Sequence, residues 1–157
     1  MLSQTAEYAL RAVAALGPTA GRLVPTTDLA KLADVPPPYL AKVLQQLASA
    51  NIIRGRRGVG GGYALSRAPH EINLLEVVLA VGPLREPRTG EQLEAQADGM
   101  RQLNEIIDGS AGYLRSTLEQ TTVADVAQDT TKIGTPEMGP TSNGVPASNG
   151  VPVGVDR

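Results

Sequence analysis

Cysteine, tryptophan and phenylalanine are absent from this sequence of 157 residues, and it contains a single histidine, His70. Without cysteine there can be no disulfide bond, no thiolate zinc site and no iron–sulfur cluster held by cysteine. One histidine is also too few for a histidine-built metal site within one chain. We therefore expect no bound metal and no cofactor.

Long apolar runs are scarce as well. No stretch approaches the roughly 18 apolar residues that a membrane span requires. The first seven residues lack the basic and apolar regions of a secretory signal. These absences predict a cytoplasmic protein that has no membrane partner.

The charge of the chain is unevenly distributed, although its net value is only −2. Residues 1–82 carry eight Lys and Arg against five Asp and Glu, whereas the remainder carries six against eleven. Such an asymmetry suggests an anion-binding part joined to something else.

Apolar residues at helical spacing predict two helices near the N-terminus. The first follows the N-cap residue Ser3 and ends at Gly17, and the second covers about 26–34. The run of three prolines that follows suits a turn and the first positions of a third helix, over 37–50. The pattern therefore predicts two helices joined by a tight turn.

A β-hairpin with a basic tip is predicted next. Two short strands, 51–54 and 62–67, enclose a connection rich in glycine and arginine. Asn73 and Glu76 then form a capping-box pattern, which starts a buried helix that ends before Gly82.

The longest periodic segment covers residues 91–121. Apolar and small residues recur there at alternating spacings of four and three, over roughly four heptads, which favours a helix paired with a second copy of the chain. Leu103 and Ile106 widen the apolar stripe. The alternative is a helix that packs only on its own domain. The predicted dimer interface consists of Met100, Asn104, Ile107, Ala111, Leu114 and Leu118.

The end of the chain differs in composition from the rest. Thr122 and Asp125 form a capping pattern that predicts a short last helix over 123–128. From about 129 onward the chain is mainly Gly, Pro, Thr, Ser and Asn, and Ser-Asn-Gly-Val-Pro occurs twice. We expect residues 129–157 to be a disordered, low-complexity tail, with a peptide that docks on a partner as the alternative.

The order of these elements predicts a mainly α fold with a small β-hairpin. Residues 1–82 form a winged helix-turn-helix domain in this interpretation. Residues 83–128 form a linker, a long dimerisation helix and the short terminal helix.

A winged helix-turn-helix domain places its third helix in the major groove of double-stranded DNA. Gln45 or Gln46 could read adenine, Tyr39 and Lys42 could hold phosphate, and the arginines of the wing, 54–62, could enter the minor groove. Tyr39 could instead be a packing residue, the glutamines solvated helix residues and the hairpin a solvated turn. The predicted DNA-binding residues are Thr27, Pro37, Pro38, Tyr39, Lys42, Gln45, Gln46, Arg54, Arg56, Arg57, Gly58 and Gly60.

Two other classes of function fit the sequence less well. The glycines of the wing do not form a nucleotide-binding loop, because a strand follows them rather than a helix. An enzyme is not expected: His70 is interpreted as a surface loop residue, and the acid pair Glu105 and Asp108 as part of a solvated helix face. A winged dimer that binds proteins and has lost DNA binding remains the alternative.

Four stretches together resemble the Rrf2 family of bacterial transcription regulators. They are 1–11 (MLSQTAEYALR), 35–47 (VPPPYLAKVLQQL), 57–67 (RGVGGGYALSR) and 72–78 (INLLEVV). The resemblance implies a homodimer with crossed long helices, recognition helices in successive major grooves and wing arginines in the minor groove.

One departure from the family pattern concerns iron. Many members of the family hold an iron–sulfur cluster with three cysteines ahead of the dimerisation helix, whereas residues 82–99 here contain no thiol. We therefore expect no cluster sensing. The effector could be a metabolite, a partner protein or nothing. The sequence thus predicts a dimeric regulator, a repressor, that binds a pseudo-palindromic operator.

Overall fold

The computed structural model describes residues 2–86 and 98–127. It is mostly helical, with one two-stranded antiparallel sheet, as the sequence predicts. In chain order the elements are α1 (Gln4–Leu16), α2 (Thr26–Ala33), α3 (Pro37–Ser49), β1 (Ile53–Arg56), β2 (Gly62–Leu65), α4 (Leu74–Val81), α6 (Asp98–Gln120) and α7 (Val123–Val126), with short 3-10 turns at Gly17–Thr19 and Pro69–Glu71.

The helix starts follow from local hydrogen bonds that the sequence signals. The Ser3 hydroxyl oxygen accepts a hydrogen bond from the Ala6 amide at 3.2 Å and so caps α1. Asn73 and Glu76 form the predicted capping box at the start of α4, with both hydrogen bonds at 2.9 Å. α3 begins at Pro37, because a proline fits the first turn of a helix, whose amides lack partners.

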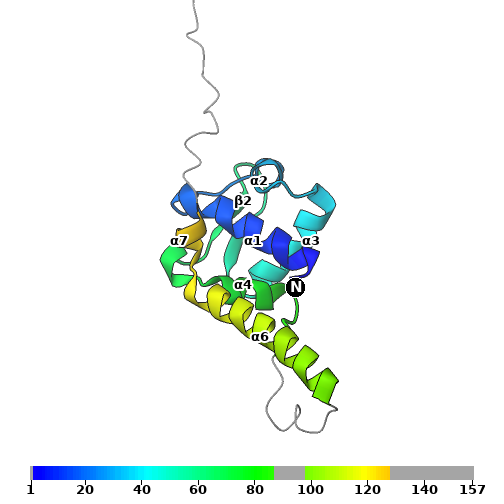
Figure 1. Cartoon of the computed structure of the whole chain (residues 1–157). Coiled ribbons are helices and arrows are strands. Elements are labelled where there is room, and N and C mark those ends of the chain that lie inside the picture. The colour runs from blue at the N-terminus through cyan, green and yellow to red at the C-terminus, as the bar shows by residue number, and fades with distance from the viewer. Residues whose placement is uncertain (1, 87–97, 128–157) are drawn as a thin grey trace, which may run out of the picture.

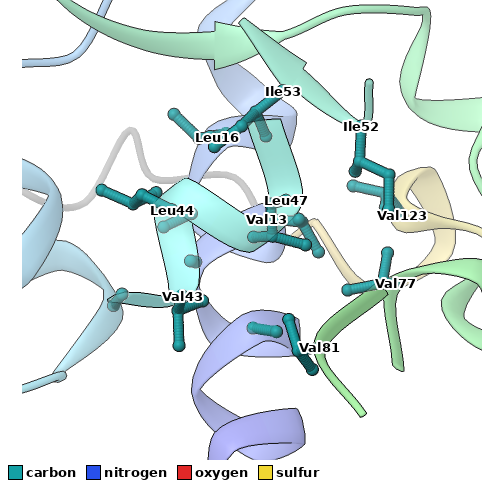
Figure 2. Close-up of a cluster of buried hydrophobic side chains, with 14 of the residues drawn as sticks. Val13, Leu16, Val43, Leu44, Leu47, Ile52, Ile53, Val77, Val81 and Val123 are labelled. Carbon is teal, nitrogen blue, oxygen red and sulfur yellow. The ribbon is translucent and has the colours of Figure 1, made fainter. Parts of the chain in front are cut away.

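A single hydrophobic core joins α1, α3, α4 and the strand region. Side chains from these elements converge in the centre of the molecule, and Val13, Leu47 and Val77 are fully buried among them (Figure 2). This core fixes the orientation of α3, since its apolar side is completely covered. The opposite side of α3 is left to solvent.

The C-terminal segment returns to this core. Leu118 and Val123 are buried in the same cluster as the residues of α1 and α3. The Val123 amide donates to the Ile72 carbonyl oxygen at 2.8 Å. The N-terminal end of α6 projects away from the body, whereas the rest of the helix runs past α4 (Figure 1). The predicted units 1–82 and 83–128 therefore share one core.

The hairpin has a third partner that the sequence does not signal. Val24 and Tyr63 exchange two backbone hydrogen bonds, of 2.8 and 2.9 Å, so the segment before α2 lies beside β2. A Cβ atom at Gly62 would collide with the Val24 carbonyl oxygen, which explains the glycine at this position. This pairing ties the base of the wing to the start of α2.

Two predictions fall outside the described residues: the start of the long helix at 91–97 and the disordered tail at 129–157. The capping box at Thr122 and Asp125 is confirmed, and α7 follows it. His70 is exposed in the second 3-10 turn, as predicted. Across the parts of the chain that the structure describes, no helix has the length and apolar character of a membrane span.

Candidate nucleic-acid interface

α3 presents a narrow exposed stripe opposite its buried side. The side chains of Leu40, Leu44 and Leu47 face the core. Half a turn away, the exposed stripe carries Pro38, Lys42, Gln45 and Ser49, with the exposed Pro37 at its N-terminal end. The stripe therefore offers one cation and one amide to a partner, which are the groups that contact phosphate and base edges in DNA.

Two predicted DNA-binding residues of α3 lie on its flank. The Tyr39 ring packs against the ring of Tyr8, with 5.9 Å between the centroids, yet Tyr39 remains 58% exposed. Gln46 is half-buried and lines a shallow hollow with Ala80 of α4, and its Oε1 atom is buried without a hydrogen-bond partner in the described structure. Of the two glutamines, Gln45 is the one that lies on the exposed stripe.

The three wing arginines differ in their surroundings. Arg54 donates a hydrogen bond from Nη2 to the Gly21 carbonyl oxygen at 3.2 Å. Arg56 and Arg57 are exposed, and their side chains make no hydrogen bond or ion pair within residues 2–86 and 98–127. Arg56 and Arg57 therefore present two free guanidinium groups at the wing, and Arg54 has a structural partner.

A groove connects the wing with the helix-turn-helix. Its volume is about 530 Å³, and it is lined by Thr26 at the start of α2, Ala48 of α3, and Arg56 and Arg57 of the wing. Thr27 is exposed beside it in the first turn of α2. Two arginines and the amides of a helix start thus border the same hollow, an arrangement that suits a phosphate group.

The tip of the wing is a tight turn from Gly58 to Gly61. The Gly61 amide donates to the Gly58 carbonyl oxygen at 3.0 Å, and Gly60 has a φ of 70°, as at the third residue of a type II turn. Val59 occupies the second position and is 100% exposed. Sequence analysis missed this residue, although a single apolar side chain among glycines was a signal that could have found it.

The residues of the predicted dimer face of α6 differ in their exposure. Asn104 and Leu118 are buried within the chain, Ala111 and Leu114 are half-buried, and Met100 and Ile107 are exposed. The exposed apolar residues of α6 follow a neighbouring stripe: Met100, Leu103, Ile106, Ile107 and Tyr113.

An ion pair anchors α6 to the segment after α4. Arg85 Nη2 lies 3.1 Å from Asp108 Oδ1, and Asp108 is only 5% exposed. The prediction that Asp108 belongs to a solvated face is wrong, because the side of α6 that carries Asp108 packs against the body. Glu105, its predicted companion, is exposed.

Solved structures with the same fold are winged-helix proteins. CymR, the global cysteine regulator of B. subtilis, superposes with a TM-score of 0.66 at 22% identity, covering 82% of this chain and 98% of that one. IscR of T. potens superposes with a TM-score of 0.62 at 19% identity, covering 86% and 91%. The fold defines the class: a winged-helix protein.

Sequence relatives identify the family. Residues 2–129 match the model of Rrf2, described as iron-dependent transcriptional regulators. An HTH-type transcriptional regulator of Mycobacterium tuberculosis is 36% identical over 129 residues, with 80% of both chains covered. IscR of Cereibacter sphaeroides is 29% identical, covering 82% of this chain and 87% of the relative. The chain belongs to the Rrf2 family.

The family description implies iron, and the donor atoms of this chain do not fit it. The sequence has no thiolate to offer. Within the described ranges, no group of three or more His, Cys, Asp or Glu side chains could hold a metal ion. Carboxylates are hard ligands and do not replace the thiolates of an iron–sulfur cluster.

Proposed function

We propose that this protein is a sequence-specific DNA-binding regulator, a repressor that binds a pseudo-palindromic operator as a homodimer. The observation that carries the proposal is that α3 and the wing border one groove. Ala48 of α3 lines this groove with Thr26 and the free wing arginines Arg56 and Arg57. Lys42 and Gln45 are exposed on the same helix as Ala48.

α3 is the proposed recognition helix. The major groove admits one α-helix, and the side chains of its exposed stripe would meet the base edges. Gln45 can bond an adenine through two hydrogen bonds, while Lys42 reaches the phosphate backbone. Pro37 and Pro38 make the N-terminal end of the stripe apolar, which suits contact with thymine methyl groups.

The wing is proposed to lie along the minor groove. Arg56 and Arg57 would enter it where it is narrow, because its negative potential is strongest there. The first turn of α2, with Thr26 and Thr27, would then face the intervening phosphate. Gly58 and Gly60 carry no side chains that would block the approach of the backbone at this point.

The exposed stripe of α6 is the proposed dimer contact. It gathers several large apolar side chains on the helix that projects from the body (Figure 1). Covering such a surface with a second copy removes it from water and generates a two-fold axis. A two-fold dimer reads two inverted half-sites, and a dimer that covers a promoter blocks polymerase without further machinery.

Selection of duplexes from a random pool tests the proposal. We expect an enriched, inverted-repeat sequence, bound with an affinity that falls steeply as salt rises. Lys42→Ala and Arg57→Ala should weaken binding to that sequence. Arg101→Ala removes one positive charge from α6, away from the proposed DNA-binding surface, and should leave the affinity for that sequence unchanged.

The same experiment separates DNA binding from the protein-binding alternative. A winged dimer that binds only proteins would enrich no sequence. Its weak affinity for any duplex would be the same in Lys42→Ala and in Arg101→Ala. Either result would overturn the proposal.

A further inference from the structure

Val59 projects from the tip of the wing into solvent. It is 100% exposed, more than any other large apolar residue in the described part of the chain. The flanking residues Gly58 and Gly60 have nothing within 4 Å of the position where a Cβ atom would lie. The apolar surface of Val59 is thus available entirely to a partner.

The tip holds Val59 in a defined place. The hydrogen bond from the Gly61 amide to the Gly58 carbonyl closes the turn, and a side chain at Gly61 would collide with the Arg56 carbonyl oxygen. Valine is branched at Cβ, so its own χ1 is restricted. The closed turn and the restricted χ1 therefore leave the two methyl groups few orientations at the tip.

We propose that Val59 contacts the floor of the DNA minor groove and discriminates against guanine there, an inference that rests on the DNA binding proposed above. The arginines on the same wing would bring the tip into this groove. Val59 would then enter the groove at the turn of the wing, two residues beyond Arg57 along the chain.

The chemistry of the minor groove supplies the discrimination. A·T and T·A pairs present acceptors there, whereas a G·C pair adds the exocyclic N2 amino donor of guanine. The methyl groups of Val59 pack against a floor without this amino group. Against guanine, the methyl groups of Val59 would displace the water molecule bound to the N2 amino group. They offer no acceptor in its place, so the amino group would lose a hydrogen bond.

This contact differs from the recognition of groove shape by arginine. An arginine responds to groove width and charge, so its contribution falls as salt rises. Val59 is uncharged, and its contribution should not depend on salt. The two effects can therefore be separated on one operator.

The test uses the whole 157-residue chain and the operator obtained by duplex selection. Each A·T pair under the proposed wing positions is replaced in turn by G·C, by inosine·C or by 2,6-diaminopurine·T. Inosine lacks the minor-groove amino group of guanine, and diaminopurine adds that group to an adenine-like base. We expect the wild type to bind the A·T and inosine·C duplexes alike, and the two amino-bearing duplexes about tenfold more weakly, as for a typical mismatch.

Two variants of Val59 and one of Arg57 complete the design. Val59→Ala should lose most of the discrimination, without a change in the salt dependence of binding. Val59→Asn places an acceptor at the tip and should improve binding to the amino-bearing duplexes relative to Val59→Ala. Arg57→Ala should weaken binding to all four duplexes, and its salt dependence should become shallower. Thermal melting should be the same for wild type and Val59→Ala, since the Val59 side chain is fully exposed in the described structure.

The outcomes distinguish this inference from the proposed function. If the wild type binds its operator but treats diaminopurine·T and A·T alike, or if Val59→Ala keeps the full discrimination, the role of Val59 is overturned and DNA binding stands. If no duplex is enriched by selection, DNA binding itself fails, and the inference about Val59 fails with it.

Discussion

The Arg54 guanidinium and the Gly21 carbonyl oxygen lie 3.2 Å apart, with Arg54 Nη2 as the donor. This hydrogen bond joins β1 to the turn that precedes α2, 33 residues earlier in the chain. Val24 and Tyr63 link the same two regions through the backbone. The wing is therefore attached to the helix-turn-helix at two points, and Arg54 makes one of them.

Arg54 and Arg57 should respond differently to removal. Arg57→Ala should reduce the slope of log affinity against log salt by about 1, if the guanidinium contacts one phosphate or groove site. Arg54→Ala should leave this slope unchanged and lower the free energy of unfolding by ~0.5–1.5 kcal/mol, since it removes one hydrogen bond. Arg54→Lys, which can still donate to Gly21, should restore the stability. Equal losses of slope in both variants would assign Arg54 to the DNA contact instead.

The ion pair between Arg85 and Asp108 should stabilise the packing of α6 against the rest of the chain. Asp108 is buried, and its Oδ2 atom has no hydrogen-bond partner in the described structure, so Arg85 is its visible source of charge compensation. Arg85→Met should lower the free energy of unfolding by ~1–3 kcal/mol, measured by urea denaturation.

A double variant separates the loss of the ion pair from the cost of leaving the buried Asp108 carboxylate without a partner. Arg85→Met combined with Asp108→Leu removes the uncompensated charge and should recover most of the loss. Glu105→Gln breaks the exposed pair with Arg101 and should cost less than about 1 kcal/mol. If Arg85→Met were as mild as Glu105→Gln, the carboxylate of Asp108 would not depend on Arg85.

The sequence predicted the elements whose signals are local. Ser3, the prolines before α3 and the capping residues Asn73 and Glu76 act within a few positions of themselves, so the pattern alone places the helix starts. The exposure of Arg56 and Arg57 also follows from their position in a glycine-rich hairpin.

Features that depend on distant contacts were not accessible in this way. Asp108 and Glu105 have the same charge and lie on the same helix, and the difference in their burial comes from Arg85 and α4. The heptad pattern of α6 likewise contains two surfaces, because Leu118 belongs to the core while Met100 is exposed. A periodicity of 3.5 residues cannot separate these neighbouring stripes.

The exposed stripe of α6 should control dimer formation. Ile106 and Ile107 lie outside the core cluster, so replacing both by Asp should leave the fold intact and place charges in the proposed interface. We expect monomers in sedimentation and at least a tenfold loss of operator affinity, since one half-site retains part of the contacts. Ser116→Asp adds a charge to another exposed part of α6 and should sediment like the wild type. A double variant that remains dimeric would exclude this stripe as the interface.

Acidification should weaken the cap of α7. The Thr122 hydroxyl and amide donate to Asp125 Oδ2 at 2.7 and 2.8 Å, and these hydrogen bonds hold the pKa of Asp125 below its ordinary value. A carboxyl whose pKa is lower in the folded state stabilises the fold above its unfolded pKa of about 3.9, and this stabilisation is lost as the pH falls.

The pH dependence should therefore be visible in a matched pair of variants. The difference in free energy of unfolding between the wild type and Asp125→Asn should be largest above about pH 5 and should shrink toward about pH 2. Thr122→Ala removes the hydroxyl but keeps the amide, so it should reduce this pH dependence without abolishing it. A difference that stays constant across this range would show that the carboxylate is not the stabilising form.

Iron should have no influence on operator binding. Iron–sulfur clusters are anchored mainly by cysteine thiolates, and mixed sites replace some of these with histidine; this chain offers no cysteine and one histidine. Protein purified without oxygen should therefore be colourless and lack the visible charge-transfer bands of a cluster. Its affinity for the selected operator should be the same before and after exposure to air or nitric oxide.

As a control, IscR of Cereibacter sphaeroides can be prepared and measured in parallel, to show that the purification preserves any cluster a relative carries. Stoichiometric iron and sulfide in this protein, together with a change in operator affinity on their removal, would place it with the iron-dependent members of its family.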